Sequence, residues 1–206
     1  MCGSQVPGPR PLEASTWPER YAEPHQDASC AMCEKDFAAP DIGWGLLLRR
    51  GVYGNAYLWR SGRVRGYVVV MWTGGHVARL TDLTARQLAG FMTEVTSAGR
   101  AIEAHYRPMP GLNVSLLEND IPHLHAHLIP RHPTAPTPDR PPAFAHLDRD
   151  RQDETHIQAD AAALRALLAD PGATEAVVGD TLPPSGGSGS RDAGRAGDEG
   201  SEEAVV

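Results

Sequence analysis

The stretch His123-Leu124-His125-Ala126-His127-Leu128-Ile129 decides how this chain folds. Histidine alternates with apolar residues in it, and in a β-strand successive side chains point to opposite faces of the sheet. The three histidines therefore share one face, while the apolar residues point the other way, toward a core. Three imidazoles in a row favour a chemical or metal-binding role over a surface strand with incidental histidines. The internal position and the apolar alternation exclude a purification tag.

The segments around this stretch also have the composition of antiparallel strands. The run VVVMW is β-branched and apolar, and Ser61-Gly62 is a turn signal just before the segment that holds it. The apolar patterns predict strands at 45–48, 55–60, 64–72, 112–117 and 124–129.

Two helices are expected as well. Thr84 and Gln87 have the spacing of a capping box, and apolar residues follow at helical spacing until Arg107-Pro108, which predicts one long helix over about 84–106. Apolar residues spaced four, three and four apart predict a second amphipathic helix, marked by Ile157, Ala161, Leu164 and Leu168. The fold class is therefore α+β, an antiparallel sheet with one long packed helix and a C-terminal helix. Trp59 and Trp72 are expected in the core.

Composition divides the 206 residues into three parts. Residues 1–27 are expected to be a loose N-terminal arm, 28–170 a folded domain with a C-terminal helical extension, and 171–206 a disordered acidic tail rich in Gly and Ser. Of the formal net charge of −7, the tail carries −5 and the rest only −2. A nearly neutral body argues against binding to a nucleic-acid backbone, whereas a small pocket still suits a free nucleotide. Because the chain has neither a long apolar run nor a secretory leader, we expect a cytoplasmic protein without membrane contact.

The cysteines favour metal over disulfide chemistry. Three cysteines are too few for a disulfide framework in a chain of this length. Cys30 and Cys33 form a Cys-x-x-Cys pair, whose two thiolates can chelate one tetrahedral Zn²⁺ with two further ligands from elsewhere. The Pro-rich flank does not offer the strand and helix that a thioredoxin-like redox pair needs. His76, just after VVVMW, and His123 are the candidates for the remaining ligands.

Taken in order, these motifs resemble the histidine triad (HIT) superfamily. The resemblance covers about Cys30 to Arg131 and includes the Cys-x-x-Cys pair, the strand meander, Gly66, His76, the long helix, Asn113 and the triad. It implies the HIT fold and, as in zinc-bearing members, a structural zinc. The family's ligand positions match Cys30, Cys33, His76 and His123.

The resemblance also implies a chemistry. The family's nucleophile matches His125, which would attack the α-phosphorus of a nucleoside phosphate conjugate and form a nucleotidyl-imidazole that water resolves. His127 matches the third histidine, expected to bond the phosphate and assist the leaving group. Asn113 matches a family Asn near ribose and phosphate. This sequence departs from the family pattern at two places. Asn119 is the candidate donor in a loop that lacks the usual Gln, and Tyr67 replaces the His that commonly follows the family's Gly.

The nucleoside pocket is less defined by the sequence. Candidates to hold the base are Trp44, Leu46 and Tyr57, for each of which plain packing is the alternative, and Arg131 is either a phosphate ligand or a surface residue. A nucleotide hydrolase or phosphoramidase is the leading prediction. Nucleotidyl transfer to another acceptor and a weakly active nucleotide-binding protein are the alternatives. The family resemblance further implies a homodimer through the long helix.

Overall fold

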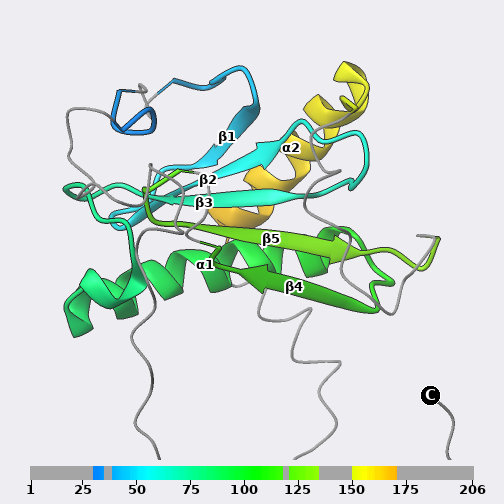
Figure 1. The fold of residues 1–206 in the computed structure, drawn as a ribbon. Helices are drawn as coiled ribbons and strands as arrows, with labels where there is room; N and C mark the ends of the chain where they lie inside the picture. The colour runs from blue at the N-terminus through cyan, green and yellow to red at the C-terminus, as the bar shows by residue number, and fades with distance from the viewer. Residues whose placement is uncertain (1–29, 35–38, 118–120, 135–149, 171–206) are drawn as a thin grey trace, which may run out of the picture.

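The computed structural model describes residues 30–34, 39–117, 121–134 and 150–170. The predicted arm at 1–27, the acidic tail at 171–206 and Asn119 lie outside the described residues. Within the described ranges the chain forms five strands and two α-helices, and it confirms the α+β class (Figure 1). Their bounds are β1 Gly45–Arg49, β2 Gly54–Trp59, β3 Val68–Trp72, α1 Ala85–His105, β4 Gly111–Ser115, β5 His125–Arg131 and α2 Glu154–Ala169, with a short 3₁₀ helix, η4, at Leu80–Asp82.

The strands form one antiparallel sheet in the order β1-β2-β3-β5-β4. The first three strands follow one another as the predicted meander. β5 then enters between β3 and β4, so the triad strand has a neighbour on each side. A central strand is paired along both edges, which holds its side chains in a fixed register.

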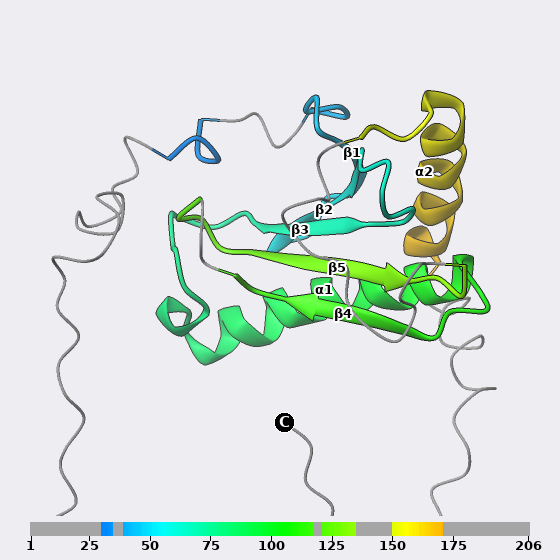
Figure 2. The ribbon, with the colours of Figure 1, turned by 45° about the vertical axis from the view of Figure 1, so that its right-hand side comes forward.

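Both helices pack on the same face of the sheet, α1 across the central strands and α2 beside β1 (Figures 1 and 2). The predicted capping box opens α1, since Thr84 Oγ1 accepts a hydrogen bond from Gln87 N–H and Gln87 Oε1 accepts one from Thr84 N–H. The four residues that predicted α2 are all buried. Trp72 is buried in this helix-side core, as expected.

A second, smaller apolar cluster covers the opposite face of the sheet. It includes Tyr57, Tyr67, Val69, Met71 and Ile129, with Cys30 and Met32 from the turn that precedes β1. Trp59 packs against this cluster and is only partly buried, so it is not in the main core. The sheet is therefore covered by helices on one face and by loops and aromatic side chains on the other.

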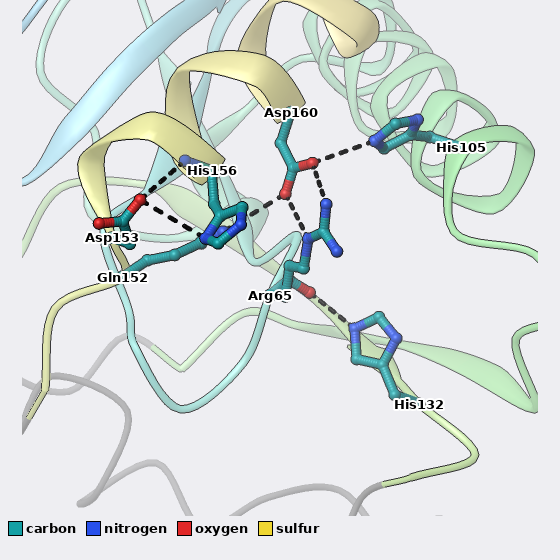
Figure 3. Close-up of polar contacts among 7 residues, drawn as sticks. All are labelled: Arg65, His105, His132, Gln152, Asp153, His156 and Asp160. Carbon is teal, nitrogen blue, oxygen red and sulfur yellow. Dashed lines mark hydrogen bonds and ion pairs between the residues drawn. The ribbon is translucent and has the colours of Figure 1, made fainter.

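The C-terminal helix is fixed to the domain by a buried carboxylate. Asp160 on α2 is 1% exposed, and it accepts hydrogen bonds from Arg65 Nε at 2.7 Å and Arg65 Nη2 at 2.6 Å. His105, at the end of α1, lies 3.3 Å away on the same carboxylate, and His132 Nε2 donates to the Arg65 carbonyl at 2.7 Å (Figure 3). Asp160 thus joins α2, the end of α1 and the segment before β3. No helix in the described part of the chain is both long enough and apolar enough to cross a membrane.

Candidate functional site

The triad histidines line the sheet face that is not covered by helices. Leu124, Ala126 and Leu128 lie in the helix-side core, as the alternation predicts. His123 precedes β5, whereas His125 and His127 belong to it, and the three are 4%, 8% and 8% exposed. The site is therefore built from buried imidazoles on a central strand.

His125 is held in one tautomer by the backbone. Its Nδ1 lies 2.6 Å from the carbonyl oxygen of His123, and a carbonyl only accepts hydrogen bonds, so Nδ1 carries the proton. Burial lowers the pKa of His125, against the opposing effect of this hydrogen bond. The neutral ring then has its lone pair on Nε2, the form in which imidazole acts as a nucleophile.

His127 lies next to His125 in a similar environment. The ring centroids are 4.7 Å apart and the ring planes meet at 74°. Burial, and then the neighbouring His125, lowers the pKa of His127 to about 4, so the ring is neutral near pH 7. Its Nδ1 is 2.6 Å from the hydroxyl of Tyr67. Tyr67, which the sequence marked only as a departure from the family pattern, therefore contacts the third triad histidine.

Cys30, Cys33, His76 and His123 come together as one group, and their ligand atoms all lie within 4.8 Å of one another. Cys33 Sγ is 3.2 Å from His76 Nδ1 and 3.5 Å from His123 Nδ1, and Cys30 Sγ is 3.7 Å from the same His123 atom. The edges of a tetrahedral Zn²⁺ site with two sulfur and two nitrogen ligands measure about 3.3 to 3.8 Å, given ordinary bond lengths. The spacing of the four ligand atoms fits such an ion.

The orientation of His123 also suits a metal ligand. Its Nε2 lies 2.9 Å from the carbonyl oxygen of Trp72, so Nε2–H donates and the unprotonated Nδ1 faces the two cysteines. A ligand histidine usually donates its other N–H in this way, which fixes its tautomer and ring orientation. The four predicted residues could therefore hold a metal ion.

The strand register decides which other predicted residues share the triad face. Residues directly opposite in an antiparallel pair lie on the same face. Asn113 pairs with Ile129, and Ser115 pairs with His127, so both lie on the triad face of β4. The register places Leu47 opposite Tyr57, while Leu46 pairs with Leu58 and is buried in the helix-side core. The structure therefore does not bring Leu46 together with the triad, and Leu47 stands on the triad face instead.

Aromatic side chains continue the triad face toward β1. Trp44 and Trp59 have ring centroids 4.4 Å apart, and Trp59 lies 5.6 Å from Tyr67, whose ring is 5.9 Å from that of His127. Sequence reasoning identified Trp44 but assigned Trp59 to the core. The alternation along β2 could have found it, since Trp59 is two residues from Tyr57 and shares its face.

Known proteins resemble this chain in one sequence segment and in fold. Residues 55–134 match the family model described as HIT domain. Solved histidine triad proteins from Bradyrhizobium japonicum and Marinobacter aquaeolei are similar in structure. The first has 22% identity and a TM-score of 0.55 over 61% of this chain and 91% of its own. The second has 18% identity and a TM-score of 0.54 over 61% of this chain and 90% of its own.

A histidine triad protein from Sinorhizobium meliloti has 17% identity and a TM-score of 0.53, and the match covers 60% of this chain and 89% of that protein. At these identities the likeness shows the fold alone. The comparison with curated proteins gives no match. Residues 55–134 of this chain are therefore similar to a HIT domain, and the matched segment contains His123, His125 and His127.

Proposed function

We propose that the protein hydrolyses a nucleoside phosphate conjugate, such as a dinucleoside polyphosphate or a nucleoside phosphoramidate, through a nucleotidyl intermediate on His125. The observation that carries this proposal is the 2.6 Å hydrogen bond from His125 Nδ1 to the His123 carbonyl, which leaves the lone pair on Nε2. The lowered pKa of His125 supports it, because a neutral imidazole is the reactive form.

The proposed reaction has two steps. Nε2 of His125 attacks the α-phosphorus, a P–N bond forms, and the bond from phosphorus to the leaving group breaks. Water then attacks the same phosphorus, the P–N bond breaks, and a nucleoside monophosphate leaves while His125 regains its lone pair. His127 would hydrogen-bond the phosphate and assist the leaving group in the first step.

The substrate contacts are proposed from placement. Asn113 lies on the triad face, and its Oδ1 has no hydrogen-bond partner among the described residues, so it suits a ribose hydroxyl that donates to it. Trp44 and Trp59 would hold the base by stacking. Leu46 has no part in this proposal because it packs against the helices. Asn119 stays a prediction, as does the homodimer.

We further propose that Cys30, Cys33, His76 and His123 hold a structural Zn²⁺. Four protein ligands fill a tetrahedral site, which leaves no open position for a substrate or an activated water. The ion would supply folding energy and would fix His123, whose carbonyl orients His125. The catalytic steps themselves would belong to the protein side chains.

Intact-mass analysis tests the nucleophile. The purified protein is mixed with a panel of nucleoside phosphoramidates and dinucleoside polyphosphates, beside His125→Ala and His156→Ala. His156 is an exposed histidine on α2, so it is a matched control. We expect a transient nucleotidyl adduct and released monophosphate with the wild type and His156→Ala. In His125→Ala the adduct should disappear and turnover should fall at least about a thousandfold.

Other outcomes would point elsewhere. An adduct that persists in His125→Ala would refute the proposed nucleophile. An adduct that water resolves slowly, but that a sugar phosphate or another acceptor consumes fast, would indicate nucleotidyl transfer. Tight nucleotide binding without adduct or product would indicate a binding protein. Tyr67 counts against this last alternative, because the residue that departs from the family pattern still contacts His127.

A further inference from the structure

Tyr67 is placed rigidly against the third triad histidine. It is 3% exposed, and its carbonyl oxygen accepts a hydrogen bond from Trp59 N–H at 2.8 Å. Its ring lies between those of Trp59 and His127, at centroid distances of 5.6 and 5.9 Å. Its hydroxyl oxygen is 2.6 Å from His127 Nδ1. Because both the backbone and the ring of Tyr67 make contacts, its hydroxyl is kept in one position.

The chemistry of the two groups indicates which of them donates. A phenol O–H is more acidic than a neutral imidazole N–H and is the better donor. An unprotonated imidazole nitrogen is more basic than a phenol oxygen and is the better acceptor. Across the 2.6 Å contact, the favoured arrangement is therefore Tyr67 O–H donating to Nδ1 of His127.

This assignment fixes the proton on the other nitrogen. A neutral imidazole carries one N–H, and if Nδ1 accepts from Tyr67, then Nε2 carries the proton. His125 has the opposite tautomer, since its Nδ1–H donates to a carbonyl. The two adjacent rings thus differ, with a lone pair on Nε2 of His125 and a hydrogen on Nε2 of His127.

We propose that Tyr67 is a positioning residue that holds His127 in its Nε2–H tautomer, so that His127 donates a hydrogen bond to the phosphate or the leaving atom of a substrate attacked by His125. The tautomer follows from contacts within the protein. The catalytic consequence rests on the proposed function. If Nε2 of His127 also carried a lone pair, it would repel a phosphate oxygen instead of donating to it.

Nitrogen-15 NMR of histidine-labelled protein tests the tautomer without any substrate. In the wild type we expect the His127 Nδ1 resonance in the unprotonated range and Nε2 in the protonated range. In Tyr67→Phe both should move toward averaged values, because the two tautomers interconvert once the hydroxyl is removed. Tyr53→Phe is the matched control, since Tyr53 stacks on Trp72 in the helix-side core. A protonated Nδ1 in the wild type, or unchanged resonances in Tyr67→Phe, would overturn the proposal.

Kinetics test the consequence for the reaction. With a nucleoside phosphoramidate, Tyr67→Phe should lower kcat about tenfold with a smaller change in KM, whereas Tyr53→Phe should change neither. Equal melting temperatures for the three proteins would exclude a folding defect as the cause. A changed tautomer with unchanged kcat would overturn the positioning role. Absence of turnover in the wild type would refute the proposed function and the catalytic consequence, while the NMR result would still decide the tautomer.

Discussion

Gly66 has a backbone conformation and a neighbour that exclude a side chain. Its φ is +81°, in the left-handed region that favours glycine. A Cβ at this position would lie 2.3 Å from the Tyr106 ring, which is itself part of the helix-side core. Because Tyr67 is the next residue, the turn at Gly66 also sets where the Tyr67 ring meets His127. One glycine thus links the packing of Tyr106 to the geometry of the triad.

We therefore expect Gly66→Ala to lower the free energy of unfolding by about 2 kcal/mol or more, from the left-handed backbone and the clash together. Chemical denaturation at pH 7 measures it. Gly75→Ala is the matched control, since a Cβ there has no atom within 4 Å among the described residues, and its effect should stay within about 0.5 kcal/mol. Equal stability of the two variants would contradict the argument.

At the scale of elements, a buried carboxylate adds to the apolar packing that holds α2 on the domain. The helix lies outside the residues that the HIT family model matches, yet it packs on β1 and α1. Burial alone would raise the pKa of Asp160, but the hydrogen bond from Arg65 and the other contacts outweigh it and lower the pKa from 3.8 to about 2. Hence Asp160 is charged whenever the domain is folded near neutral pH, and that charge stabilises the position of α2.

The sign of the pH dependence follows from this lowered pKa. A carboxyl group whose pKa is lower in the folded state stabilises the fold above the unfolded pKa and loses that contribution as the pH falls through the folded pKa. For Asp160 this range runs from 3.8 down to about 2, and the contribution is about 2 kcal/mol. Denaturation of wild type and Asp160→Asn between pH 7 and pH 2 should show a stability difference that is constant above pH 5 and narrows below pH 4. A difference independent of pH would contradict it.

At the scale of the whole molecule, the candidate metal site joins three parts of the chain. Cys30 and Cys33 precede β1, His76 follows β3, and His123 precedes β5. The same His123 provides the carbonyl that orients His125. A metal at this site would therefore tie the first turn to the sheet and stabilise the strand end that carries the triad.

We expect the purified protein to contain one zinc ion per chain, by elemental analysis, and chelation to lower the free energy of unfolding by at least about 3 kcal/mol. Cys33→Ser should reproduce most of this loss and should lower the zinc content, because it removes one of four ligands. His132→Ala, a histidine outside the group, should keep the zinc. If the metal-free protein melts at the same temperature as the untreated protein, the zinc assignment fails.

The sequence by itself determined the features that depend only on residues close to one another in the chain. The alternation around His125 set which side chains of β5 face the core, and the Thr84 capping box and apolar spacing set the extent of α1 to within one residue at each end. These patterns repeat with the geometry of a strand or a helix, so a short window contains them. The two cysteines and two histidines of the candidate metal site could also be identified from the sequence, because a metal needs particular ligand types. The structure brings these four residues together.

Only the tertiary structure decided which distant side chains meet. It brings the Tyr67 hydroxyl into hydrogen-bond contact with His127, 60 residues away in the sequence. It likewise brings Asp160 into contact with Arg65, 95 residues away. It also turned Leu46 toward the helices and Leu47 toward the triad face. Such contacts depend on strand register and on β5 entering between β3 and β4, and a slip of one residue would exchange the two faces. Strand register depends on the packing of the whole sheet. It therefore cannot be predicted from any one short stretch of sequence.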